Sequence, residues 1–189
     1  MTPDQIYSQC IDKQRVVITG DGSQFITLLI LHVLKNYNRK FDFVLEGQEP
    51  ALHNDSPTVI IQGSTQLLDY KHHIGVISEF SSGAEAKLIE QFADATPKGG
   101  SLIYSDNDAK AKLIGSKERV DIQAIPFRTY QHVVLNGKTI LISSTNEKIT
   151  INLSEDLHLQ YVSAAKEILK KIGITSDQFY KSLPSFQLN

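Results

Sequence analysis

The sequence lacks three features that would each assign it to a class of protein: paired cysteines, a long hydrophobic run and a strong net charge. Its one cysteine, Cys10, excludes an internal disulfide and is typical of a reducing compartment. The longest apolar run, 25–33, is about half as long as a membrane-spanning helix requires. With 19 basic and 21 acidic residues, the chain has no basic excess for binding nucleic acid or an anionic membrane. We expect a cytoplasmic protein that binds neither.

Buried-strand and helix patterns alternate along the first two thirds of the chain. Runs of apolar and β-branched residues predict strands over 15–19, 41–45, 58–61, 74–77, 101–104 and 121–125. Helices are predicted over 3–12, 26–37, 84–95 and 109–114, the first of them capped by Thr2. Strands that alternate with helices form a mainly parallel sheet with helices on its faces. The predicted fold class is therefore α/β.

The pattern changes in the last third of the chain. Asn136-Gly137, which suits a type I′ turn, separates the apolar runs 133–135 and 139–143 and predicts a β-hairpin. The segment 148–153 could add a third antiparallel strand. Two helices are predicted over 157–172 and 177–183, ending at Gly173 and Pro184. Since no repeat or linker interrupts the chain, one domain is predicted over 1–189.

The segment after the first predicted strand, Gly20-Asp21-Gly22-Ser23-Gln24-Phe25, lies between a strand and a helix. In that setting, backbone N–H groups and the helix dipole can bind phosphate. The segment has the frame of a G-x-x-G-K-[ST] loop, but Ser23, Gln24 and Phe25 replace its second glycine, its lysine and its Mg²⁺-binding hydroxyl residue. Leaving a desolvated phosphate without its cation costs about 3–5 kcal/mol, and Asp21 adds like charge. We interpret the segment as a plain turn or, alternatively, as a residual anion or nucleotide site.

Several segments resemble Mur ligases. The stretch RVVITGDGSQFITLLILHVLK (15–35) is similar to their loop region, most of all in the ligase that joins UDP-N-acetylmuramate to a recycled tripeptide. The resemblance continues in order through 41–47, 58–64, 73–78, 88–108, 125–142 and 163–186. It spans nearly the whole chain but only the central ATPase domain of the family. It implies a parallel sheet wrapped by helices with a small antiparallel sheet, and the absence of the UDP-binding and C-terminal ligase domains.

The residues that the family uses for ATP and metal do not carry over. Gln62 stands where the resemblance implies a glutamate that helps to hold Mg²⁺, and Ser82 where it implies a metal-binding histidine. The family's H-N-x-x-N motif near the nucleotide matches Leu157, His158 and Tyr161. His158 therefore joins the 20–25 loop as a degenerate nucleotide-site position. No catalytic residue, no metal ligand and no cofactor is expected, because phosphoryl transfer depends on charge compensation.

Two functions follow from this resemblance. The first is a non-catalytic, Mur-ligase-like protein, a pseudoenzyme or scaffold whose expected partner is a full-length Mur ligase or another cell-wall protein. The alternative is an ATP-dependent UDP-N-acetylmuramate–peptide ligase, or a nucleotide-binding subunit of one, which would require ATP and Mg²⁺. Calorimetry with MgATP distinguishes them.

A few other polar residues have simpler interpretations. Glu79, the acid nearest to the family's metal position, is interpreted as a helix-start or solvated residue. Lys166, Lys170 and Lys171 are expected to form a solvated helix face. The adjacent pair His72-His73 precedes a strand, where neighbouring side chains point to opposite faces, so a shared metal ion is not expected.

Overall fold

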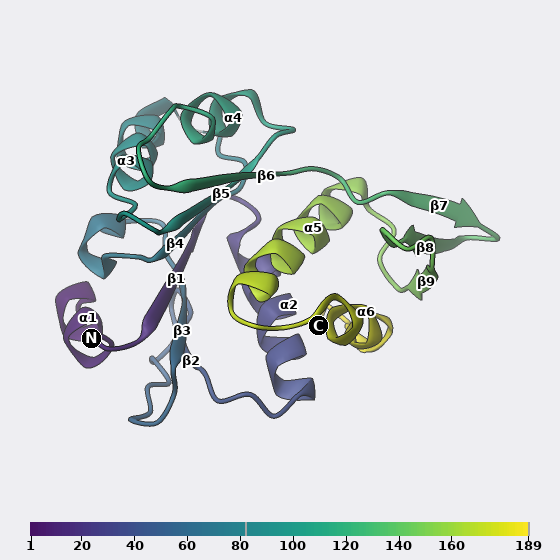
Figure 1. Cartoon of the computed structure of the whole chain (residues 1–189), viewed down its shortest axis with the longest axis horizontal. Coiled ribbons are helices and arrows are strands. Elements are labelled where there is room, and N and C mark those ends of the chain that lie inside the picture. Colours follow the sequence, from purple (N-terminus) through teal and green to yellow (C-terminus); the bar gives the residue numbers. More distant parts are fainter. Residues whose placement is uncertain (82, 189) are drawn as a thin grey trace.

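Six parallel strands form the centre of the computed structural model, which describes residues 1–81 and 83–188 (Figure 1). The sheet has the order β2-β3-β1-β4-β5-β6, so β1 lies between β3 and β4. The strands are β1 (Gln14–Thr19), β2 (Asp42–Val44), β3 (Thr58–Gln62), β4 (Ile74–Ile77), β5 (Ser101–Ser105) and β6 (Gln123–Phe127). The predicted α/β fold with a parallel sheet is confirmed.

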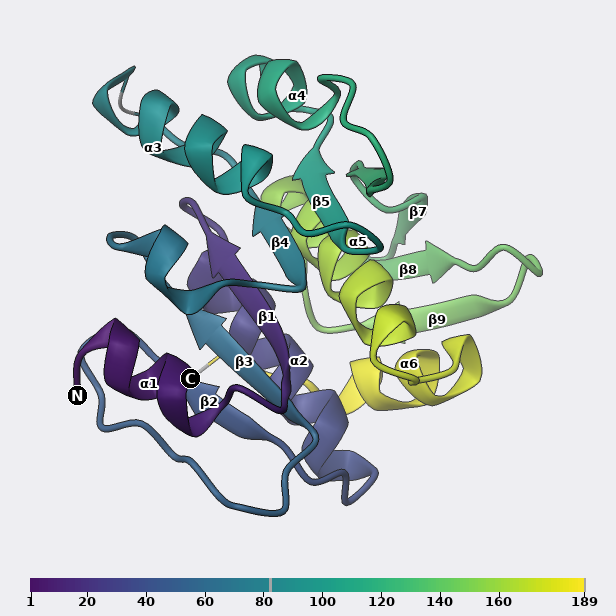
Figure 2. The ribbon, with the colours of Figure 1, turned by 60° about the vertical axis from the view of Figure 1, so that its left-hand side comes forward.

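Helices cover both faces of this sheet (Figure 2). They are α1 (Pro3–Gln9), α2 (Ser23–Asn36), α3 (Gly83–Asp94), α4 (Ala109–Gly115), α5 (Asp156–Lys171) and α6 (Ser176–Ser182), with short 3-10 helices over Leu67–Tyr70 and Leu183–Ser185. Because side chains alternate along a strand, Val16 and Ile18 join the core formed with α2, α5 and α6, whereas Val17 joins the core formed with α1, α3 and α4. None of the helices in the described ranges is long and apolar enough to cross a membrane.

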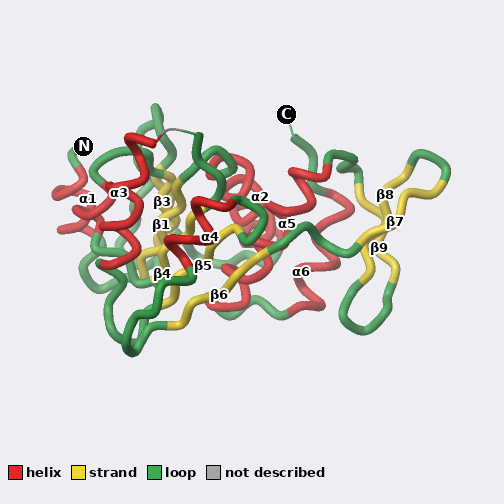
Figure 3. Tube along the Cα trace, turned by 90° about the horizontal axis from the view of Figure 1, so that it is seen from above, coloured by secondary structure: helices red, strands yellow, loops and turns green. Residues whose placement is uncertain are grey.

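The last third of the chain adds a small antiparallel sheet at one end of the molecule (Figure 3). Its strands are β7 (His132–Leu135), β8 (Lys138–Ile142) and β9 (Lys148–Ile151), in that order. Asn136 and Gly137 have positive φ angles of 51° and 73°, as a type I′ turn requires. The predicted hairpin and its third strand are both confirmed.

Most element boundaries agree with the prediction to within two residues, and the largest difference at a strand start is at β6. This strand starts at Gln123 rather than residue 121, because Asp121 has a φ of 61° and belongs to a turn. The carbonyl of Asp121 accepts a hydrogen bond from the Gly99 amide in the connection before β5. A residue with positive φ cannot continue an extended strand.

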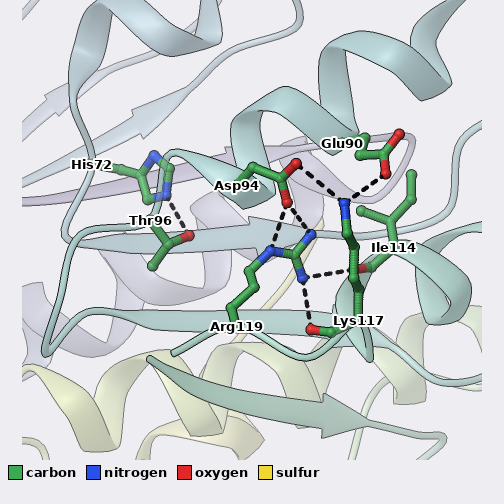
Figure 4. Close-up of polar contacts among 7 residues, drawn as sticks. All are labelled: His72, Glu90, Asp94, Thr96, Ile114, Lys117 and Arg119. Carbon is green, nitrogen blue, oxygen red and sulfur yellow. Dashed lines mark hydrogen bonds and ion pairs between the residues drawn. The ribbon is translucent and has the colours of Figure 1, made fainter. Parts of the chain in front are cut away.

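A charged network ties α3 to the segment that follows α4 (Figure 4). Asp94 at the end of α3 receives a hydrogen bond from Arg119 Nε (2.9 Å), and Arg119 Nη2 lies 2.8 Å from the same oxygen. Arg119 Nη1 also donates to the carbonyl of Ile114 at 2.9 Å. Lys117 bridges Glu90 and Asp94 at 3.0 and 3.4 Å. These contacts hold the two helices together on one face of the sheet.

Candidate functional site

The loop between β1 and α2 lies at the carboxyl edge of the sheet, where open α/β sheets bind ligands. Gly20 leaves β1 with a φ of +97°, a conformation that glycine adopts most readily. A Cβ on Gly20 would lie 2.4 Å from Ser78 Oγ and 2.6 Å from the carbonyl oxygen of Glu79. The loop is therefore pressed directly against the end of β4.

The backbone amides that would face a phosphate in such a loop donate to the protein itself. Three successive bonds run from Asp21 N to Glu79 O (2.7 Å), from Gly22 N to Ser78 Oγ (3.0 Å) and from Ser23 N to Gly20 O (3.0 Å). The Ser78 hydroxyl, fully buried, also donates to the carbonyl of Thr19 at 3.1 Å. Since an N–H group has one proton to donate, these amides are already satisfied.

An aromatic cluster fills the space between the start of α2 and the start of α5. The Phe25 ring stacks on His158, with centroids 4.7 Å apart and planes at 13°. It also contacts Tyr161 and Phe186, at centroid distances of 5.6 and 5.5 Å. Tyr161 covers the loop as well, since a Cβ on Gly22 would lie 2.2 Å from its ring. The residues that replace the family's hydroxyl and its H-N-x-x-N asparagines therefore contact one another.

Two further replaced positions also lie side by side. Gln62 Nε2 at the end of β3 donates a long hydrogen bond to Ser23 Oγ, at 3.4 Å. Gln24 is exposed on the first turn of α2, where its side chain has no described partner. Ser82, the counterpart of the metal-binding histidine, lies outside the described residues. The sequence prediction named six loop residues, His158 and Gln62 as degenerate site positions, and the structure brings His158 and Gln62 into contact with the loop.

The cavity beside the loop has acidic walls and little room. Its volume is about 130 Å³, well below the roughly 300 Å³ at which ligand pockets usually begin. It is lined by Thr19, Gly20, Asp21, Ser23, Glu46, Ser64, Glu85, Leu88 and Ile89. Three of these residues carry carboxylates and none is a lysine or arginine, so the electric field repels a polyphosphate. The size and charge of this cavity do not fit the polyphosphate of ATP.

Glu79 follows β4 and turns its carboxylate inward, contrary to the sequence interpretation of a solvated or helix-start residue. Both carboxylate oxygens are buried, and neither makes a hydrogen bond of normal geometry with the described residues. Burial raises the pKa of this carboxyl, and the charges of Asp108 and Asp21 add to the rise, while a backbone N–H and the nearby Tyr161 hydroxyl oppose it. The Glu79 carboxylate is buried because the loop packs over the end of β4 and excludes water.

Replacing Glu79 with glutamine should therefore change how stability depends on pH. A carboxyl with a raised pKa binds its proton more tightly in the folded chain, so stability falls as pH rises through the folded-state pKa. Glutamine has no proton to lose. The free energy of unfolding of Glu79→Gln, relative to the unmodified chain, should rise between about pH 4 and about pH 7. Urea denaturation at both values measures it.

The matched control is Glu118→Gln, an exposed carboxylate on the segment after α4. Its relative stability should stay level over the same pH range. A flat response for Glu79→Gln as well would mean that the Glu79 carboxyl is hydrated rather than buried.

The adjacent histidines His72 and His73 contact different parts of the chain. His72 is buried, packs on Phe92 with centroids 4.1 Å apart and lies 3.0 Å from Thr96 Oγ1 (Figure 4). Burial lowers the pKa of His72 to about 4, so its ring is neutral at neutral pH. His73 contacts Arg15 on another side. Within 1–81 and 83–188, no group of three or more metal-ligating side chains comes together.

Sequence reasoning missed the residues that close the loop. Ser78 ends a segment that the resemblance covered, and Tyr161 matches the last position of the family's H-N-x-x-N motif, yet neither was assigned a contact with the loop. The available signal was a small hydroxyl residue directly after a buried strand, since parallel strands end at the same edge of a sheet. Which hydroxyl accepts a hydrogen bond from which amide depends on the register between β1 and β4. That register cannot be read from a single sequence.

Comparison with known proteins identifies the fold. No family model and no curated protein sequence matches the chain. Among solved structures, it superposes on MurF from Acinetobacter baumannii with a TM-score of 0.80 at 10% identity, covering 99% of this chain and 48% of MurF. The UDP-N-acetylmuramate:L-alanyl-γ-D-glutamyl-meso-diaminopimelate ligase from Neisseria meningitides gives a TM-score of 0.75 at 12% identity, over 99% and 70% of the two chains.

The same fold also occurs in a folylpolyglutamate synthase. Folylpolyglutamate synthase from Mycobacterium tuberculosis, solved with ADP and AMPPCP, gives a TM-score of 0.73 at 10% identity, over 98% of this chain and 61% of that one. The chain spans about half the length of the MurF structures that it matches. At such low identity the likeness establishes the Mur ligase fold alone, which agrees with the fold that the sequence resemblance implied.

Proposed function

We propose that this chain is a non-catalytic protein with the Mur ligase fold, in which the phosphate-binding loop has become a structural turn. The observation that carries the proposal is the closed loop: the amides of Asp21, Gly22 and Ser23 all donate to protein acceptors. A phosphate could reach them only if the loop moved away from Ser78 and Glu79. That movement would break the two hydrogen bonds from Asp21 N to Glu79 O and from Gly22 N to Ser78 Oγ, each worth about 0.5–1.5 kcal/mol.

The aromatic cluster supports the same proposal from the other side of the site. Opening the space beside α5 would require Phe25 to leave its stack on His158 and its contacts with Tyr161 and Phe186. Exposing a buried phenylalanine costs about 1.5–3 kcal/mol in transfer free energy. Together with the broken hydrogen bonds, opening costs several kcal/mol before any contact with a nucleotide forms.

Phosphoryl transfer would also lack its charge compensation. The reaction requires cations around the transferred phosphate, supplied by a lysine, an arginine or Mg²⁺. Here Gln24 and Gln62 hold the corresponding positions, and the adjoining cavity carries the carboxylates of Asp21, Glu46 and Glu85. These residues favour a role in binding over a role in ATP-driven ligation.

Isothermal titration calorimetry with MgATP tests the proposal. We expect no heat of binding up to about millimolar nucleotide, because the cost of opening the loop alone reduces affinity by several orders of magnitude. Folylpolyglutamate synthase from Mycobacterium tuberculosis, which was solved with ADP, serves as the positive control. Micromolar binding by this chain would overturn the proposal and favour the alternative, an ATP-dependent UDP-N-acetylmuramate–peptide ligase or a nucleotide-binding subunit of one.

For the binding role, we propose a full-length Mur ligase or another cell-wall protein as the kind of partner. The support for this class of partner is the fold that the chain shares with those ligases. Sedimentation of the chain with purified MurF would show a heavier species if the two associate. Separate sedimentation at about micromolar concentrations would count against this class of partner.

A further inference from the structure

A lysine lies between two tyrosines where the small sheet meets α5 and α6, far along the chain from the β1–α2 loop. Lys166 Nζ donates hydrogen bonds to the hydroxyls of Tyr180 (2.8 Å) and Tyr130 (3.1 Å). The two hydroxyl oxygens are themselves 2.5 Å apart. The three side chains come from α5, from the segment between β6 and β7, and from α6. This arrangement corrects the prediction of a solvated lysine face for Lys166, whereas Lys170 is exposed as expected.

The charge of this half-buried ammonium group is not balanced by a carboxylate. No acidic side chain in the described part of the chain lies within ion-pair distance of Lys166 Nζ, although Glu167 is its sequence neighbour. An ammonium group has three protons, and the two tyrosines take two of them. One proton therefore remains for a further acceptor.

The pKa values of Tyr130 and Tyr180 both depend on these hydrogen bonds. Burial would raise the pKa of Tyr180, but hydrogen bonds from Lys166 and Tyr130 outweigh it, and the pKa of Tyr180 falls below its usual value. Burial and the hydrogen bond to Tyr180 raise the pKa of Tyr130. The lowered pKa of Tyr180 shows that the ammonium group of Lys166 favours negative charge on the atoms beside it.

An open cavity of about 360 Å³ adjoins this cluster, a size typical of small-molecule sites. We call it the Lys166 cavity. Its walls are Pro126, Phe127, Arg128, Thr129, Tyr130, Gln131, Ile142, Ser143, Ser144, Ser163, Lys166 and Glu167. The hydroxyls of Ser144 and Ser163 have no hydrogen-bond partner among residues 1–81 and 83–188. Arg128 donates from its Nε to Asp106, and its two terminal nitrogens have no partner in the described ranges.

We propose that the Lys166 cavity binds a small molecule through a carboxylate or phosphate group held by Lys166, Arg128 and Ser163. Such an oxyanion accepts the third proton of Lys166 and further protons from the free serine hydroxyls and the guanidinium group, giving charge-assisted hydrogen bonds from several elements. Glu167, which also lines the cavity, disfavours a second acidic group on the same ligand. No lining residue is shared with the cavity beside the closed loop, so this site is independent of the proposed function.

Titration of the full chain with inorganic phosphate and, separately, with acetate tests the proposal by ¹H–¹⁵N NMR at constant ionic strength. The expected result is a set of saturable shifts centred on the amides of Ser144 and Ser163. Lys166→Gln should weaken binding about tenfold or more, because it removes a charge-assisted hydrogen bond. Lys170→Gln, the same change one helical turn away on the exposed face, should leave the affinity within about twofold.

A second variant keeps the test sound if Lys166→Gln fails to fold. Arg128 is exposed, so Arg128→Gln should fold normally and still weaken binding several-fold. Tighter binding of phosphate assigns a phosphate ester as the ligand class, and tighter binding of acetate assigns a carboxylic acid. The proposal is overturned if neither anion gives saturable shifts up to about 100 mM, or if Lys170→Gln weakens binding as much as the two cavity variants do.

Discussion

Gly20→Ala is expected to lower the free energy of unfolding by about 3 kcal/mol, combining backbone strain with a steric clash. The φ of +97° disfavours any side chain, at a cost of about 1–2 kcal/mol. The added methyl group would also lie 2.4 Å from Ser78 Oγ and 2.6 Å from the Glu79 carbonyl, and backbone cannot move aside as a flexible side chain can. Urea denaturation measures the loss.

Gly99→Ala separates the two contributions. Gly99 also has a positive φ, of +77°, but a Cβ there would meet no atom within 4 Å. Its replacement should cost only the backbone strain, about 1–2 kcal/mol. If the two variants lose the same stability, the loop is not pressed against β4 and its closure is wrong.

Phe25→Thr is expected to cost about 3 kcal/mol, although threonine is the residue type that a working phosphate loop carries at this position. Phe25 now belongs to the core: its ring stacks on His158 and contacts Tyr161 and Phe186. Removing the ring leaves a cavity whose walls are aromatic. Because the ring supports the start of α5, thermal and urea denaturation should both report the loss.

Gln24→Lys is the matched control, since it restores the neighbouring loop residue at an exposed position. Surface changes of this kind shift stability by no more than about 0.5 kcal/mol. A loss below about 1 kcal/mol for Phe25→Thr, similar to that of the control, would show that Phe25 is not part of the core.

The sequence alone predicted the order and type of the main strands and helices. Periodicity was informative here because β1 is buried on both faces and the Asn136-Gly137 turn has a strong local preference. It did not predict the 3-10 helix over Leu67–Tyr70, which follows Gln66 in a left-handed conformation. This short helix packs against α1 and β1, and the spacing of apolar residues in the sequence does not reveal such packing.

The sequence indicated the residue types at the site but not the contacts between them. Residue types at positions 20–25 and at Gln62 predicted a loss of phosphate and metal binding, because those positions match motifs of the family. The closing contacts join residues that are 56 positions apart for Gly22 with Ser78 and 133 positions apart for Phe25 with His158. The Lys166 cluster likewise joins three elements, so its charge imbalance appears only once they are packed.

Amide hydrogen exchange at Asp21 and Gly22 tests the closed loop most directly. If these amides donate to Glu79 and Ser78, they should exchange about a hundredfold or more slowly than unprotected amides, and MgATP should leave their rates and NMR shifts unchanged. Exchange at the unprotected rate, or marked slowing and shifting when MgATP is added, would show instead that the loop is open to phosphate.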